Sequence, residues 1–127
     1  IHICLDAARD DCLIVYDVNL RPPFFERAWI EQSLRRAKIV KLNNDEVRVL
    51  SNLFATSTET DHDFAKWLLS KQPQTDLVCV TRGADGCLAV SRTESIDVPG
   101  IAVRVADTVG AGDAFTAALI PVSYTHL

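Results

Sequence analysis

Residues 107–120 have the sequence Asp107-Thr108-Val109-Gly110-Ala111-Gly112-Asp113-Ala114-Phe115-Thr116-Ala117-Ala118-Leu119-Ile120. The two glycines let the backbone turn tightly and approach a ligand, and the small or apolar residues after them suit a buried helix. The first N–H groups of a helix have no partner within it and bear a partial positive charge, so they attract anions such as phosphate. The segment therefore predicts a phosphate site with the carboxylate of Asp113 beside it.

Asp113 also has a simpler explanation, because an aspartate in the first turn stabilises a helix through its dipole whatever its function. Two familiar phosphate motifs do not fit the segment. No Gly-Lys-Ser/Thr follows the glycines, which excludes a P-loop. A dinucleotide oxidoreductase would need a third glycine to complete this motif, and the sequence has none there.

A polar block follows the first apolar run of the chain. After the apolar run Leu13 to Tyr16, polar residues alternate with apolar ones: Asp17, Asn19 and Arg21 are polar. Pro22-Pro23 then ends the predicted strand. Side chains at the C-terminal end of a strand lie where open α/β sheets bind ligands. The same pattern is equally typical of a polar loop that closes a strand.

A second block, Lys41 to Glu46, ends the predicted strand 39–42 and begins a predicted helix. Asn43 and Glu46 have the spacing of helix-capping residues, and capping alone explains them. A third block, Thr81 to Gly86, separates two apolar strands and has glycines placed for a tight hairpin, which requires no function.

Taken together, these four segments resemble the ribokinase, or PfkB, family of carbohydrate kinases. The C-terminal signature of that family is matched at each restricted position by residues 107–120, and the other three blocks occur in the family's order. The resemblance implies that Asp113 is the general base toward a sugar hydroxyl. It also implies that Gly110, Ala111 and Gly112 form an anion hole for the transferred phosphoryl group.

The resemblance assigns further roles around this centre. It implies that Asn43 and Glu46 help to hold Mg²⁺ through water, which suits an ion that keeps several waters. The D-x-N-x-R block looks most like that of the fructokinase branch, which implies that Asp17, Asn19 and Arg21 lie near the active site, on its substrate side or elsewhere in it. Asp107 and the Val109 carbonyl match part of the family's site for a monovalent cation such as K⁺. The residues implied for the nucleotide are Thr81, Gly83, Gly86, Thr108, Gly110 and Gly112.

The alternation of strands and helices predicts a ribokinase-like, three-layer α/β/α fold with a mostly parallel, Rossmann-like sheet. We expect the hairpin and a turn at residues 98–100 to add an antiparallel margin. Trp29, Ile30, Leu34 and Ala37 have helical spacing and are expected in the core. The expected helices are a helix end at 3–8, those at 25–37, 45–53 and 61–70, and the helix that the glycine turn opens and that includes 114–120. The expected strands are 13–16, 39–42, 77–81, 87–90 and short ones around 96–105.

The resemblance covers residues 13–120, and members of the family are considerably longer. We therefore expect residues 1–120 to be the C-terminal part of a kinase domain that is inactive without the remainder. Pro121 is expected to interrupt the last helix, and residues 121–127 match nothing in the family. This last segment is interpreted as a non-native tail.

Composition indicates the class of protein. The 127 residues have a formal charge of −4 and are 48% hydrophobic, and no apolar stretch approaches the ~20 residues of a membrane span. We expect a cytoplasmic enzyme whose partners are ATP and a small sugar, with no nucleic acid or membrane; a homodimer is left open for the full-length parent. No C-x-x-C spacing links the cysteines, which are expected to be buried free thiols: Cys4, Cys12, Cys79 and Cys87.

The resulting hypothesis is an ATP-dependent kinase that phosphorylates a primary hydroxyl of a sugar. Fructose is the preferred acceptor, since residues 17–23 and 41–46 resemble those of fructokinases. Ribose, 2-keto-3-deoxygluconate and nucleosides are served by the same scaffold, and fold alone does not determine the substrate. A non-catalytic nucleotide-binding fragment is the alternative from another functional class.

Overall fold

The computed structural model of the chain describes residues 7–9, 11–102 and 110–126. Within these residues, five strands form one sheet in the order β1-β2-β3-β4-β5. Strands β1 to β3 are parallel, and β4 and β5 add antiparallel pairs at one margin. The elements in chain order are β1 (Val15–Asp17), α2 (Arg27–Leu34), β2 (Ile39–Asn43), α3 (Asn44–Leu53), α4 (Asp61–Lys71), β3 (Leu77–Thr81), the 3-10 turn η1 (Gly83–Asp85), β4 (Cys87–Ser91), β5 (Ser95–Val98) and α5 (Ala111–His126).

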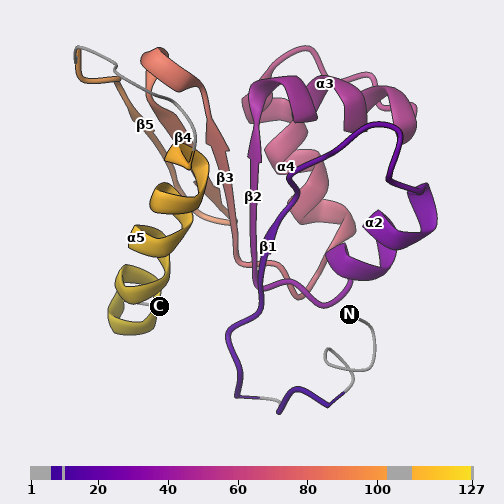
Figure 1. Cartoon of the computed structure of the whole chain (residues 1–127), viewed down its shortest axis with the longest axis horizontal. Helices are drawn as coiled ribbons and strands as arrows, with labels where there is room; N and C mark the ends of the chain where they lie inside the picture. The colour runs from indigo at the N-terminus through magenta and orange to yellow at the C-terminus, as the bar shows by residue number, and fades with distance from the viewer. Residues whose placement is uncertain (1–6, 10, 103–109, 127) are drawn as a thin grey trace.

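The helices lie on both faces of the sheet. Of the helices in the described residues, α2, α3 and α4 cover one face and α5 lies on the other (Figure 1). The three-layer α/β/α fold expected from the sequence is therefore confirmed as a partial domain. None of the helices within the described ranges combines the length and apolar character that crossing a bilayer requires.

The hydrophobic core lies between the sheet and helices α2 to α4. Successive strand residues point to opposite faces, and alternate residues of the central strands join one buried cluster with residues of these helices. The intervening residues of the same strands point toward α5. The cluster includes Ile30, Leu34, Val40, Leu42, Phe64, Leu68, Val78, Val80, Leu88 and Val90.

Two helices begin with the capping interactions that their sequences predict. At α3, the Asn43 side chain accepts a hydrogen bond from the Glu46 N–H at 2.9 Å, and the Glu46 carboxylate accepts one from the Asn43 N–H at 2.8 Å. This reciprocal capping box uses two donors that the helix leaves without partners. At α4, the Thr60 hydroxyl accepts a hydrogen bond from the Asp63 N–H.

The structure corrects two expectations about the helices. Trp29 is 50% exposed, whereas Ile30, Leu34 and Ala37 are buried. Helix α2 presents only a narrow stripe to the core, and Trp29 lies one residue outside it. Pro121 does not interrupt the last helix, since α5 continues through it to His126. Proline removes one backbone donor from a helix, but its own backbone angle remains helical.

Other expectations concern the ends of the described segments. The helix end predicted at 3–8 lies mostly outside the described residues, and Ala7 and Ala8 form a turn and a bend. Strand β5 ends at Val98, and any strand between 103 and 105 also falls outside the described part of the chain.

Candidate active site

The glycine turn before α5 has the geometry of a helix N-terminus open to a ligand. Gly110 has φ +79°, a left-handed conformation that glycine adopts readily. Its carbonyl accepts the Ala114 N–H at 2.9 Å, which is the first hydrogen bond of the helix. Asp113 is exposed in this first turn, next to the half-buried Gly112. The predicted anion hole and base therefore lie side by side on an accessible surface.

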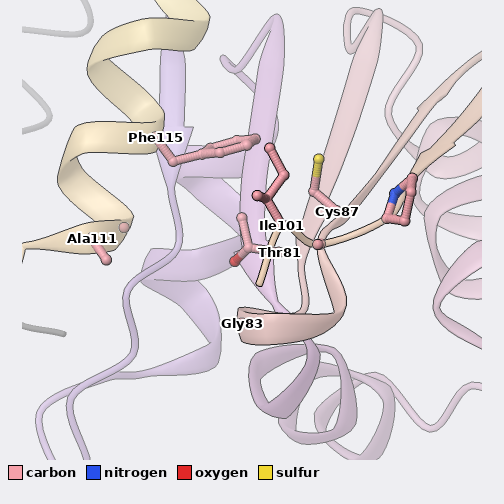
Figure 2. A pocket seen from close by; sticks show the side chains of 10 residues that line it. Thr81, Gly83, Cys87, Ile101, Ala111 and Phe115 are labelled. Carbon is pink, nitrogen blue, oxygen red and sulfur yellow. The ribbon is translucent and has the colours of Figure 1, made fainter. Parts of the chain in front are cut away.

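A pocket of about 400 Å³ lies between this turn and the β3–β4 hairpin. Phe115 of α5 extends toward Ile101, while Thr81 and Cys87 come from the hairpin strands (Figure 2). The volume is within the range of roughly 300–1,000 Å³ typical of small-molecule sites. The pocket is lined by Thr81, Gly83, Gly86, Cys87, Pro99, Gly100, Ile101, Ala111, Gly112 and Phe115.

This pocket unites two sets of predicted residues that are far apart in the sequence. Thr81, Gly83 and Gly86, expected to line the nucleotide phosphates, share it with Ala111 and Gly112 of the expected anion hole. Its apolar side chains suit a flat ring, and the glycine backbone and helix N-terminus suit phosphate oxygens.

The hairpin wall of the pocket is built by close backbone packing. Gly86 has φ +94°, and a Cβ at this position would collide with the Val98 carbonyl oxygen. A Cβ on Gly100 would likewise collide with the Ala84 carbonyl. The two segments can therefore approach this closely only with glycine at both positions.

Arg82 holds the same hairpin from outside the pocket. Its Nε atom lies 3.0 Å from Asp61 Oδ2 at the start of α4, and its Nη1 atom lies 2.8 Å from Asp97 Oδ2 of β5. The hydrogen bond to Asp97 is the main cause of a raised pKa of Arg82. The guanidinium thus connects the hairpin to the helix and to the edge strand.

On the α5 face, a buried lysine lies next to the glycine turn. The Lys41 Nζ atom is 3.1 Å from Oδ1 and 3.0 Å from Oδ2 of Asp17. It also lies 3.0 Å from the position that a Cβ on Gly112 would occupy. The Thr116 hydroxyl donates to Asp17 Oδ2 at 2.8 Å, so this carboxylate links α5 to the sheet.

Asn43 and Glu46, the residues expected to hold a metal, lie where β2 ends and α3 begins: Asn43 is the last residue of β2 and Glu46 is in the first turn of α3. Glu46 is buried; its Oε2 accepts the Asn43 N–H and its Oε1 accepts the Leu20 N–H, both at 2.8 Å. Each carboxylate oxygen retains a second lone pair that can accept a hydrogen bond from water. The pair therefore fits a Mg²⁺ ion held through its waters better than one ligated directly.

The remaining predicted residues are spread around this centre. Asn19, with φ +41°, and Arg21 are exposed on the loop after β1. That loop is joined to the start of α3 by the bond between Leu20 and Glu46. The residues predicted for the cation and nucleotide at positions 107–109, namely Asp107, Thr108 and Val109, lie outside the described residues.

Comparison with known proteins identifies the family. The pfkB family of carbohydrate kinases matches residues 4–122, which is nearly the whole chain. The chain belongs to the pfkB family of carbohydrate kinases.

Individual relatives of this pfkB-family chain are kinases of sugars and related compounds. It is 31% identical to the fructokinase of Escherichia coli over 112 residues, covering 84% of the chain and 34% of that protein. A crystal structure of a fructokinase with bound ATP from Xylella fastidiosa matches with a TM-score of 0.75 and 26% identity, covering 91% of the chain and 36% of that structure. The structure of aminoimidazole riboside kinase from Salmonella enterica, in complex with aminoimidazole riboside and an ATP analog, matches with a TM-score of 0.68 and 30% identity. The match covers 85% of the chain and 36% of that structure. The chain thus spans about a third of the length of these relatives.

Two polar residues of this candidate site, Lys41 and Thr116, were given no role from the sequence. Lys41 stands within an otherwise apolar strand, and Thr116 is a lone hydroxyl in a helix of small and apolar residues. A polar side chain in an apolar strand is the signal that could have singled out Lys41, because buried charges are usually paired. Nothing in the sequence indicated that Asp17 was the shared partner.

The cysteines of the pfkB-family chain differ in environment. Among the described cysteines, all are free, but only Cys79 is buried; Cys87 is half-buried and Cys12 is exposed. The expectation of burial was therefore wrong for Cys12, which precedes β1 in an exposed turn. Burial raises the pKa of Cys79 from 9.0 to about 12, with a smaller contribution from the charge of Cys87.

The raised pKa of Cys79 predicts a loss of stability in alkali. Below pH 9 the thiol is protonated in both the folded and the unfolded chain, so it adds no pH dependence. Between pH 9 and about 12 the unfolded chain releases the proton while the folded chain retains it, so stability falls as pH rises. Over this range, each pH unit lowers the free energy of unfolding by about 1.4 kcal/mol.

Urea unfolding of the full-length protein at pH 8 and pH 10.5 would measure this effect. We expect Cys79→Ala to lose less stability between the two pH values than the unsubstituted protein. Cys12→Ala removes an exposed thiol and is expected to leave the alkaline loss unchanged. Equal losses in the Cys79 variant and the unsubstituted protein would contradict the prediction.

Proposed function

We propose that the full-length protein to which this chain belongs is an ATP-dependent fructokinase. The observation that supports it most strongly is the pocket in which the Thr81–Gly86 hairpin meets the glycine turn of α5. ATP would lie in this pocket, with its phosphates toward Gly110, Ala111 and Gly112. Thr81, Gly83 and Gly86 would line the nucleotide from the other side, together with Thr108.

In this proposal Asp113 is the general base. It removes the proton from a primary hydroxyl of the sugar as that oxygen attacks the γ-phosphorus in line. The bond from the γ-phosphorus to the β-phosphate oxygen breaks and ADP leaves. The amides of the glycine turn stabilise the negative charge on the transferred group, and the ammonium of Lys41 adds positive charge close to Gly112. Positioning and charge stabilisation supply most of the acceleration in such transfers.

Asn43 and Glu46 would hold Mg²⁺ through water, and Asp107 and the Val109 carbonyl would contribute to a site for a monovalent cation such as K⁺. Mg²⁺, when bound, neutralises charge on the ATP phosphates. Asp17, Asn19 and Arg21 are assigned to the substrate side of the site. In keeping with the composition of the chain, we place the enzyme in the cytoplasm with ATP and a small sugar as its partners.

Fructose is proposed as the acceptor because the relatives include fructokinases at 31% and 26% identity. A riboside is the second candidate, because a kinase in complex with aminoimidazole riboside is 30% identical to the chain. The chain spans about a third of the length of its relatives. In a kinase as long as these relatives, residues beyond the present chain would take part in binding the acceptor. We therefore expect residues 1–127 alone to give no turnover.

The test is ADP release by the full-length protein with Mg²⁺-ATP and a panel of fructose, ribose, 2-keto-3-deoxygluconate, adenosine and aminoimidazole riboside. We expect the highest kcat/KM with fructose. Preference for a riboside would replace fructose by the second candidate. Binding of ATP without turnover on any acceptor would indicate a non-catalytic nucleotide-binding protein instead.

A further inference from the structure

Three polar side chains meet where the carboxyl end of β1 and the middle of β2 face α5. We name Asp17, Lys41 and Thr116 the polar clamp. Asp17 and Lys41 are direct partners in the register of the parallel strands, so both side chains leave the sheet on the same face. Thr116 reaches them from α5, 99 residues from Asp17 in the sequence.

Within the clamp, the buried ammonium of Lys41 is paired with the carboxylate of Asp17. The Lys41 side chain is only 8% exposed, and burial of an unpaired ammonium would be costly. Both carboxylate oxygens of Asp17 lie within 3.1 Å of its Nζ atom. Asp17 therefore determines where the ammonium sits, which is 3.0 Å from the position that a Cβ on Gly112 would occupy.

Thr116 connects this ion pair to the glycine turn. Its hydroxyl oxygen is 2.8 Å from Asp17 Oδ2 and 3.0 Å from the Gly112 carbonyl oxygen. A hydroxyl has one proton to donate, and the carboxylate is the stronger acceptor. The bond to Asp17 thus holds α5, one helical turn after Gly112, against the carboxyl end of β1. Thr116 is not among the residues that line the pocket.

We propose that Thr116 is a positioning residue, which acts through Asp17 to hold the glycine turn and Asp113 in register with Lys41. This inference rests on the proposed kinase function. Phosphoryl transfer depends on placing the base and the anion hole precisely about the transferred group. Loss of the clamp bond should therefore slow the chemical step more than it weakens ATP binding, which depends on the pocket residues.

The test compares Thr116→Val, which keeps the shape but removes the donor, with Thr116→Ser, which keeps the donor. In the full-length protein we expect Thr116→Val to lower kcat about tenfold with the KM for ATP within about twofold, and Thr116→Ser to restore most of kcat. Rates are divided by the number of ATP-binding sites measured in the same sample, so that misfolded protein does not count as slow protein. Thr116→Ala, a strong helix former, is expected to give the same loss and serves if valine prevents folding.

A double-mutant cycle with Asp17→Asn provides the second readout. Because Thr116 acts through Asp17, we expect the double variant to be little slower than the slower single variant. Additive losses, or a Thr116→Val enzyme with unchanged kcat, would overturn the positioning role. An unsubstituted protein without turnover on any acceptor would instead refute the proposed function, so the two failures are distinguishable.

Discussion

Replacement of Asp113 by asparagine in the full-length protein is expected to lower kcat at least about 10²-fold, with little change in the KM for ATP. Asparagine has the size of aspartate but cannot accept the proton of the sugar hydroxyl. The pocket is lined by Ala111, Gly112 and Phe115 of α5 but not by Asp113, so nucleotide binding should persist. Steady-state ADP release and direct measurement of ATP binding would separate the two effects.

Asp63→Asn is the matched control for this substitution. Asp63 also lies exposed in the first turn of a helix, so its replacement removes a comparable interaction with the helix dipole, of about 0.3–1 kcal/mol. It lies in α4 and does not line the pocket. If Asp113 only capped its helix, both variants would lose similar stability and neither would lose turnover. Full turnover in Asp113→Asn would remove this residue from the mechanism.

Gly86→Ala is expected to lower the free energy of unfolding by about 3 kcal/mol. The residue has φ +94°, and the added Cβ would overlap the backbone at Val98, Pro99 and Gly100. To relieve the overlap, the hairpin must move away from the segment 98–100, which together with it forms one wall of the pocket. We therefore also expect the KM for ATP to rise. Urea unfolding and ADP release in the full-length protein would measure the two effects.

Gly83→Ala is the control for backbone strain without overlap. Gly83 lies in the same turn with φ +58°, but no atom lies within 4 Å of where its Cβ would be. Alanine at this position would only have to adopt a left-handed backbone conformation, which should lower the free energy of unfolding by about 1–2 kcal/mol. Equal losses of stability in the two variants would show that close packing at Gly86 is not the cause.

The sequence predicted the elements of this fold best where their causes are local. The capping box of α3 involves residues three positions apart, and the β3–β4 hairpin has its glycines within six residues, so both could be recognised without the tertiary structure. Prediction was poorer where the partner was distant. Trp29 has helical spacing with buried residues, yet only the packing of α2 against the sheet decides which side of that helix is covered.

In the candidate site too, local features could be predicted from the sequence, and contacts between distant segments could not. The glycine turn, its aspartate and the hairpin glycines were recognisable from residue type and spacing. Their meeting in one pocket was not, because it depends on α5 lying on the face of the sheet opposite to the other helices (Figure 1). The role of Glu46 as an acceptor for the Leu20 N–H, which joins the loop after β1 to the start of α3, likewise required the tertiary structure.

By itself, then, the sequence determined the three-layer class of the fold, the helix N-terminus at Gly110 to Asp113 and the resemblance to one family of kinases. The first two depend on periodicity, turn chemistry and capping, which act between residues close together in the chain. The resemblance depends on short motifs whose residues are likewise close together in the chain. Only the tertiary structure decided that Asp17, Lys41 and Thr116 share one set of hydrogen bonds, with Lys41 against Gly112. Strand register and the packing of α5 bring these residues together, and both are set by contacts between segments up to 99 residues apart.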